Sequence, residues 1–331
     1  MKIFVAMPKG EIRNSFIPQD IKEKLEALGE VRWNESNKHL TEDELAEQIG
    51  DAEVCITGWS NAPFTKKVLD CAENLKVIAH TGGTVAFFTN DEVYDRGIKV
   101  MSGNEVFAQS VAEGVLCYML AALRRIPQFC DQVQKEGWSK PGWYNEGLIG
   151  QKVGIIGFGA VSRYTVELLK PFQVELLICA RHLNEEQTEA LGAKKATLEE
   201  IFSTCKIVSV HLANTPENYH KIDESLMNRL KSDSLLVNTA RGAVIDEAAM
   251  ARLLRDNRFR AILDVFEEEP LPMSSPLRGL ENVLLIPHMG GPTIDRRPFV
   301  TDALIKHLPA ALRGEDTILD ISKEAMHRMT K

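Results

Sequence analysis

The stretch VGIIGFGAVSR constrains the fold of this chain more than any other, because a glycine turn in it joins an apolar run to a helical pattern. Gly157 permits the tight turn, and Gly159 lets the backbone approach phosphate groups. The amides of Ala160 and Val161 open the following helix, where the helix dipole favours an anion. This order of signals predicts a loop that binds a dinucleotide pyrophosphate. The alternative is an ordinary strand-to-helix turn, and Ser162 stands where the fingerprint prefers Gly or Ala.

Two series of alternating strand and helix signals predict two parallel sheets with crossover helices. The first series has apolar runs at 3–7, 54–58 and 75–79 and a helical pattern at 21–28. The second series predicts six strands, which complete a doubly wound sheet. These strands are expected at 153–156, 174–179, 207–210, 235–238, 261–265 and 283–286.

Three further segments organise the chain. A long helix is expected over 106–123, before Pro127, and its length suits a connector between two domains. A stretch rich in Gly, Trp and Pro follows at 137–143 and precedes the second series. Beyond Thr293, leucines at four-residue spacing predict a C-terminal helix.

Bulk properties exclude several classes of protein. A chain of 331 residues suits two domains. The formal net charge of −8 argues against nucleic acid as a partner, because phosphate binding needs a basic surface. No apolar run is expected to approach membrane-spanning length. Six cysteines without paired spacing indicate free thiols in a reducing cytoplasm and no structural zinc or other metal site.

Polar residues follow the predicted strands of the second series, where ligands bind in open α/β sheets. Any one of them taken alone is more often a surface or capping residue, and the acidic run before Pro270 could be a solvated turn. Their convergence from separate strands nevertheless predicts a site that holds a fixed cation, histidines and carboxylates. The residues are Arg181, His182, His211, Arg241, Asp264, Glu269 and His288.

Several motifs in this half of the chain resemble those of the D-isomer-specific 2-hydroxyacid dehydrogenases. They are NTARG at 238–242, LDVFEEEP at 263–270 and PHMGG at 287–291, and SVAE at 110–113 resembles the opening of the family's interdomain helix. Within this family, the chain most resembles the glyoxylate/hydroxypyruvate reductases and phosphoglycerate dehydrogenase.

The resemblance implies two Rossmann-like domains with doubly wound parallel sheets. A discontinuous, flavodoxin-like substrate domain is expected over 1–103 and 293–331, and an NAD(P)-binding domain over 104–292. The resemblance also implies a homodimer formed around the cofactor domain.

The resemblance assigns three catalytic roles. Arg241 matches the arginine that grips the substrate, and its planar fork suits a 2-oxo acid. His288 matches the acid/base that gives a proton to the carbonyl oxygen as hydride reaches C2. Glu269 matches the carboxylate that orients this imidazole.

Cofactor and substrate contacts follow in the same way. Asp264 matches the acceptor for the nicotinamide carboxamide, and Thr239 and His211 line the cofactor side. The family's substrate loop, usually Gly-Val-Gly-Val-Asp, corresponds here to the run that ends Gly82-Gly83-Thr84-Val85-Ala86. Its backbone amides can still bind a substrate carboxylate, but Thr84 and Ala86 depart from the pattern. His80, just before this loop, either contacts substrate or helps the loop to pack.

The second strand of the cofactor domain bears on the choice of cofactor. NAD-specific members carry an acidic residue where this chain has Ala180, and Arg181 and His182 follow at once. The cofactor is therefore expected to be NAD or NADP, with NADP favoured.

The combined expectation is a cytoplasmic NAD(P)-dependent oxidoreductase that interconverts a small 2-oxo acid and a D-2-hydroxy acid, with no nucleic-acid or membrane partner. Two alternatives stay open. One is oxidation of another small anion, since formate and phosphite dehydrogenases share this scaffold, and the other is a dinucleotide-sensing binding protein.

Overall fold

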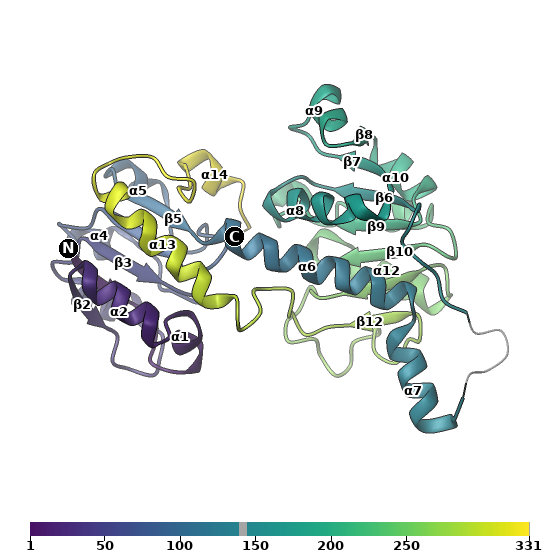
Figure 1. Cartoon of the computed structure of the whole chain (residues 1–331), viewed down its shortest axis with the longest axis horizontal. Coiled ribbons are helices and arrows are strands. Elements are labelled where there is room, and N and C mark those ends of the chain that lie inside the picture. The colour runs from purple at the N-terminus through teal and green to yellow at the C-terminus, as the bar shows by residue number, and fades with distance from the viewer. Residues whose placement is uncertain (139–143, 331) are drawn as a thin grey trace. The chain divides into compact units, whose positions relative to one another are not determined.

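The computed structural model describes residues 1–138 and 144–330, so residues 139–143 of the Gly-, Trp- and Pro-rich stretch lie outside the description. The chain forms two compact units, Met1–Ser110 with Pro292–Lys331 and Val111–Gly291. Each unit contains one parallel sheet with helices on both faces (Figure 1). This confirms the predicted class of two doubly wound α/β domains.

The first unit contains a five-stranded sheet in the order β2-β1-β3-β4-β5. This is the flavodoxin-like order. The strands are β1 (Lys2–Val5), β2 (Glu30–Trp33), β3 (Val54–Thr57), β4 (Val77–His80) and β5 (Lys99–Ser102). The sequence patterns missed β2 and β5, which lie at the two edges. Only two of the four residues are apolar in each, EVRW in β2 and KVMS in β5, so neither strand carries a strong apolar signal.

Helices cover both faces of this sheet because successive side chains of a strand point to opposite faces. Phe4 packs into the core that includes α3 and α4, whereas Ile3 and Val5 pack into the core that includes α2 and α13. In Figure 1, α2 and α13 lie side by side on their face. The helices are α1 (Glu11–Phe16), α2 (Gln19–Leu28), α3 (Glu42–Ile49), α4 (Lys66–Cys71), α5 (Asp91–Asp95), α13 (Arg297–Leu312), which confirms the predicted C-terminal helix, and α14 (Lys323–His327).

The second unit contains seven strands in the order β12-β11-β10-β9-β6-β7-β8. This is the Rossmann order with one further strand. Six strands were expected, and the one missed is β8, a three-residue edge strand with two exposed lysines. The strands are β6 (Lys152–Ile156), β7 (Glu175–Cys179), β8 (Ala193–Lys195), β9 (Ile207–Val210), β10 (Leu235–Asn238), β11 (Arg260–Leu263) and β12 (Val283–Leu285).

The helices of the second unit again lie on both faces. Val153 and Ile155 pack with residues of α6 and α8, and Ile156 packs with residues of α10 and α12. The helical segments are α6 (Asn104–Leu123), α7 (Ile126–Glu136), α8 (Ala160–Leu169), η1 (Lys170–Phe172), α9 (Glu185–Ala190), α10 (Leu198–Thr204), η2 (Pro216–Asn218), α11 (Glu224–Met227), η3 (Gly242–Val244) and α12 (Glu247–Arg255).

Helix α6 differs from the sequence-based expectation in one respect. Its 20 residues, with a mean hydropathy of 1.6, are by length and composition sufficient to cross a membrane, and it is the one such helix among the described residues. The expectation that no apolar run approaches this length was therefore wrong. Val115, Met119 and Leu123 are fully buried in the core of the second unit, and 39% of the apolar window of α6 is buried, so packing accounts for part of its apolar composition.

Candidate active site

The glycine loop lies between β6 and α8, as the fingerprint predicts. Gly157 has φ 87°, and a Cβ there would lie 2.7 Å from the carbonyl oxygen of His211. By contrast, a Cβ on Gly159 would meet no atom within 4 Å. Gly157 is thus required by the fold, whereas Gly159 leaves open space above the start of a helix whose first amides have no partner within the helix. These features fit a pyrophosphate group.

Ser162, which departs from the fingerprint, stabilises this loop. The side chain is buried at 1% exposure. Its hydroxyl donates to the carbonyl of Gly157 at 3.2 Å and accepts from the amide of Gly159 at 3.3 Å. A small hydroxyl therefore bridges both glycines, a role that the sequence pattern alone did not reveal.

Substitution of the two glycines should separate folding from ligand binding. Gly157→Ala forces a side chain into the left-handed region and against backbone, so we expect a loss of about 1–3 kcal/mol of unfolding free energy. Gly159→Ala should leave unfolding unchanged but weaken dinucleotide binding, because its methyl group takes the open space. Chemical denaturation and cofactor titration of both variants test this, and equal stability of the two variants would contradict it.

Two further polar residues line the same end of the sheet. His211 follows β9, its ring lies 2.9 Å from the hydroxyl of Ser209, and burial lowers its pKa to about 4. Thr239 follows β10, and its buried hydroxyl has no hydrogen-bond partner in the described residues. An unpaired buried hydroxyl is costly unless a ligand supplies the partner. Thr239 and the open space over Gly159 thus both fit a bound dinucleotide.

The residues after β7 become exposed within two positions of the strand end. Ala180 is half-buried, whereas Arg181 and His182 are open to solvent, and the His182 ring lies 6.5 Å from that of Phe158 in the glycine loop. No ion pair of Arg181 occurs within the described ranges. The strand end therefore offers positive charge beside the glycine loop.

The loop after β10 presents Arg241. The side-chain amide of Asn238 donates to the Arg241 carbonyl at 2.9 Å, and its oxygen accepts from the Ala240 amide at 3.1 Å, which closes the loop tightly. The next residue is Gly242, where a Cβ would lie 1.9 Å from the backbone carbon of Phe266. Burial lowers the pKa of the Arg241 guanidinium, and the nearby charge of Glu269 acts in the opposite sense.

Glu269 and His288 contact each other directly. Nδ1 of His288 lies 2.5 Å from Oε2 of Glu269, and the other carboxylate oxygen accepts from the amide of Phe266 at 2.9 Å. His288 has φ 52°, a left-handed conformation that is uncommon for residues other than glycine. The strained backbone and the carboxylate together hold the imidazole in one orientation, with Nε2 left to act on a ligand.

Asp264 holds the loop that carries His288. It is 1% exposed, and its two carboxylate oxygens accept from the amides of Met289 and Gly290, both at 2.7 Å. Burial raises the pKa of Asp264, while these two amides act in the opposite sense. This loop contact was not foreseen from the sequence, which gives no sign that Met289 and Gly290 lie beside Asp264.

The predicted substrate loop lies in the first unit, after β4. His80 is 1% exposed, its Nδ1 lies 2.9 Å from the hydroxyl of Thr57, and burial lowers its pKa to about 3. A Cβ on Gly82 would lie 2.3 Å from Nε2 of this ring, so the ring packs directly under the loop. This geometry favours the loop-packing interpretation of His80.

Other contacts fix the same loop. The Ser102 hydroxyl lies 2.9 Å from the carbonyl oxygen of Gly82 and 2.6 Å from that of Gly83. The Thr84 hydroxyl, one of the departures from the family pattern, donates to the carbonyl of Thr330 at 2.7 Å. Ala86, the other departure, is buried. The two unusual residues therefore serve the packing of the unit.

The chain resembles known proteins along most of its length. Residues 116–290 match the family model for the NAD-binding domain of D-isomer specific 2-hydroxyacid dehydrogenases. The D-3-phosphoglycerate dehydrogenase of Methanocaldococcus jannaschii is 33% identical over 88% of this chain, which spans 55% of that relative's length. The glyoxylate reductase of Thermococcus litoralis is 30% identical over 90% of this chain and 92% of its own length. Among solved structures, the PH0520 protein from Pyrococcus horikoshii aligns with a TM-score of 0.80 and 26% identity, over 98% of this chain and 96% of its own.

Proposed function

Because the chain belongs to the D-isomer-specific 2-hydroxyacid dehydrogenase family, whose members are oxidoreductases acting on CH–OH donors, we propose that it interconverts a small 2-oxo acid and the corresponding D-2-hydroxy acid. The observation that carries this proposal is the contact between Glu269 and His288 in the unit that also presents Arg241. A protein that bound the cofactor but lacked this pair could sense a dinucleotide, but it would have no positioned proton donor.

The proposed mechanism gives each of the three residues one task. Arg241 binds the substrate carboxylate and carbonyl through its planar fork, and its partial burial strengthens that pairing. His288 donates a hydrogen bond to the Glu269 carboxylate through Nδ1–H, so its Nε2–H is the proton that goes to the carbonyl oxygen. NAD(P)H, when bound, supplies the hydride to C2. In the reverse direction Nε2 takes the hydroxyl proton.

The remaining site residues are proposed in supporting roles. In the second unit, Gly157, Gly159, Ala160 and Val161 hold the pyrophosphate, and Thr239, His211 and Asp264 line the nicotinamide side. In the first unit, Gly82 and Gly83 supply backbone groups to the substrate carboxylate, and His80 supports them from below. We assign the first unit as the substrate domain and the second as the cofactor domain.

A panel of 2-oxo acids tests the proposed reaction. Glyoxylate, hydroxypyruvate, pyruvate and bulkier 2-oxo acids are each supplied with NADH or NADPH, and consumption of the reduced cofactor is followed. We expect turnover of at least one small 2-oxo acid. Tight cofactor binding without turnover of any of them would instead favour the dinucleotide-sensing alternative, and turnover of formate or phosphite alone would favour the other-anion alternative.

The cofactor class is NAD(P), and we propose a preference for NADP. An acidic residue at the end of β7 would bind the ribose hydroxyls and repel a 2′-phosphate, and Ala180 removes both effects. The exposed guanidinium of Arg181 can pair with that phosphate, with His182 beside it.

We therefore expect kcat/KM to be higher with NADPH than with NADH, and this preference to reverse in the Ala180→Asp/Arg181→Pro double variant. The matched control is Arg255→Gln. This substitution removes an exposed arginine at the end of α12 and should leave the preference unchanged. A wild-type preference for NADH above about tenfold, or ~1.4 kcal/mol, would contradict the proposal.

We also propose that the protein is a cytoplasmic homodimer associated through the second unit. All six cysteines are free thiols, which suits a reducing compartment. Ile126 and Val133 on α7 are each 51% exposed, and such an apolar helix surface is typical of a subunit contact. Light scattering of the purified chain measures the oligomeric state directly.

A further inference from the structure

A cavity of about 440 Å³ lies in the first unit, where β1 and β2 end. It is lined by the loop after β1, by α1 and the start of α2, and by the end of β2. Its volume falls within the range of small-molecule sites. The predicted substrate loop follows β4, which is two strands from β1 in this sheet, or about 10 Å at ~4.8 Å per strand. The cavity is thus separate from that loop.

The charge of the cavity is positive. Lys9, Arg13 and Lys22 line it together with one carboxylate, that of Glu35, although the whole chain carries a net charge of −8. Lys22 meets Glu26 on its own helix at 3.7 Å, which is a long, exposed contact of the kind that holds a lysine weakly. A concentration of cations on an acidic protein needs an explanation beyond the overall composition.

Arg13 is held in place without being neutralised. Its Nη1 donates to the carbonyls of Asn34 at 2.7 Å and Met7 at 3.4 Å, and the guanidinium lies 5.4 Å from the centre of the Trp33 ring. Burial lowers its pKa, and only the more distant charge of Glu35 acts in the opposite sense. Within the described ranges Arg13 has no ion pair, and it lines the cavity, so its guanidinium is available there as an oriented donor.

The backbone around Arg13 is held in place by hydrogen bonds of Asn34. Asn34 is fully buried, and its side-chain amide donates to the carbonyls of Ala6 and Lys38, both at 3.2 Å. The ammonium of Lys22 lies 5.6 Å from the centre of the same Trp33 ring. Trp33 therefore has two cations close to its ring and contributes an apolar surface to the cavity.

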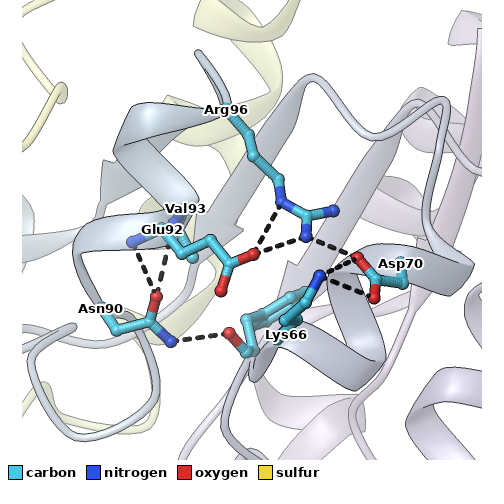
Figure 2. A network of polar contacts seen from close by, with 7 residues as sticks. Lys66, Asp70, Asn90, Glu92, Val93 and Arg96 are labelled. Carbon is cyan, nitrogen blue, oxygen red and sulfur yellow. Dashed lines mark hydrogen bonds and ion pairs between the residues drawn. The ribbon is translucent and has the colours of Figure 1, made fainter.

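A second cavity of the same unit offers a comparison. Its volume is about 330 Å³, and its arginine is Arg96. Figure 2 shows that this guanidinium is already paired with Asp70 and Glu92. The two ion-pair distances are 2.6 Å and 2.5 Å. The charge of Arg96 is thus neutralised by carboxylates of the protein, whereas the charge of Arg13 has no such partner among the described residues. Of the two cavities, only the first therefore offers an unpaired arginine to an anion.

We propose that the cavity bounded by Lys9, Arg13, Lys22 and Trp33 binds a small organic anion with two negative charges, either a phosphate monoester or a dicarboxylate. The bidentate fork of Arg13 takes one anionic group, and the two lysines supply the remaining charge. The apolar part of the ligand lies on Trp33. This site is independent of the proposed reaction, since its residues play no part in it.

Calorimetric titration of the whole 331-residue chain saturated with NADPH tests this site. The probes are glycerol 3-phosphate and succinate, with glycerol as the uncharged reference. We expect saturable binding of at least one anion, and the Lys9→Gln/Lys22→Gln variant should weaken it by about tenfold or more, as expected for lost charge-assisted contacts. The matched control Lys66→Gln/Lys67→Gln removes two exposed lysines from α4, on the other face of the sheet, and should bind normally.

The catalytic residues are excluded as the source of binding with the variant Arg241→Gln, which should retain the anion. Binding of glycerol 3-phosphate alone identifies a phosphate monoester, and binding of succinate alone identifies a dicarboxylate. The proposal is overturned if neither anion binds, if both lysine double variants bind equally, or if binding disappears in Arg241→Gln. None of these results bears on turnover of 2-oxo acids, so the proposed function stands or fails separately.

Discussion

Replacement of His288 by asparagine is expected to lower kcat by about 10²- to 10⁴-fold, the usual contribution of a positioned acid/base. Asparagine tolerates the left-handed backbone at φ 52°, so the loop should keep its shape, and its amide can still meet Glu269. It cannot, however, give a proton to the substrate. Cofactor binding should stay near normal, since the change affects proton transfer only.

A closely matched control for this variant is His220→Asn. His220 also has a left-handed backbone, at φ 47°, and its Nε2 lies 2.7 Å from a carboxylate oxygen of Glu267. It repeats the histidine–carboxylate pair outside the proposed mechanism, so kcat should be unchanged. If His288→Asn and His220→Asn had the same kcat as the wild type, His288 would have no part in the reaction.

Replacement of Arg241 by lysine is expected to reduce kcat/KM for 2-oxo acids by about 10- to 10²-fold, which corresponds to ~1.5–3 kcal/mol for hydrogen bonds to a charged group. Lysine keeps the charge but loses the two-pronged donor geometry that matches a carboxylate and carbonyl. Burial of this site makes the loss larger than it would be on the surface. Steady-state kinetics of the variant measure the effect.

Two comparisons define the result for Arg241. The exposed Arg255 on α12 provides the control, because Arg255→Lys should leave kcat/KM unchanged. Cofactor affinity of Arg241→Lys should also match the wild type. A kcat/KM within about twofold of wild type, the span of innocuous surface changes, would remove Arg241 as the substrate anchor.

The sequence predicted the strand ends well because buried parallel strands carry strong apolar signals and ligand-binding residues follow them. Gly157, Arg241 and His288 were all placed after strands in this way, and the structure has them after β6, β10 and β12. The edge strands β2, β5 and β8 were missed, since each contains few apolar residues: two of four in β2 and in β5, and one of three in β8.

The contacts that support the site could not be predicted, since they join residues far apart in the chain. Asp264 accepts from amides 25 and 26 positions away, and His80 meets Thr57 across 23 positions. Such pairings depend on how strands align and loops fold back, which a single sequence does not encode locally. Ser162 lies close in sequence to its partner, but its hydroxyl reaches the carbonyl of Gly157 only because the chain turns there. The residue that departs from the fingerprint therefore stabilises the loop.

The most direct test of the proposed reaction is to reduce a small 2-oxo acid other than glyoxylate, whose product has no D or L form, with NADPH or NADH that carries deuterium at the transferable position of the nicotinamide. The account predicts a 2-hydroxy acid of D configuration with one deuterium at C2, because hydride goes to that carbon while His288 protonates the oxygen. A product of L configuration, a product without deuterium at C2, or no product from any 2-oxo acid of the panel would contradict it.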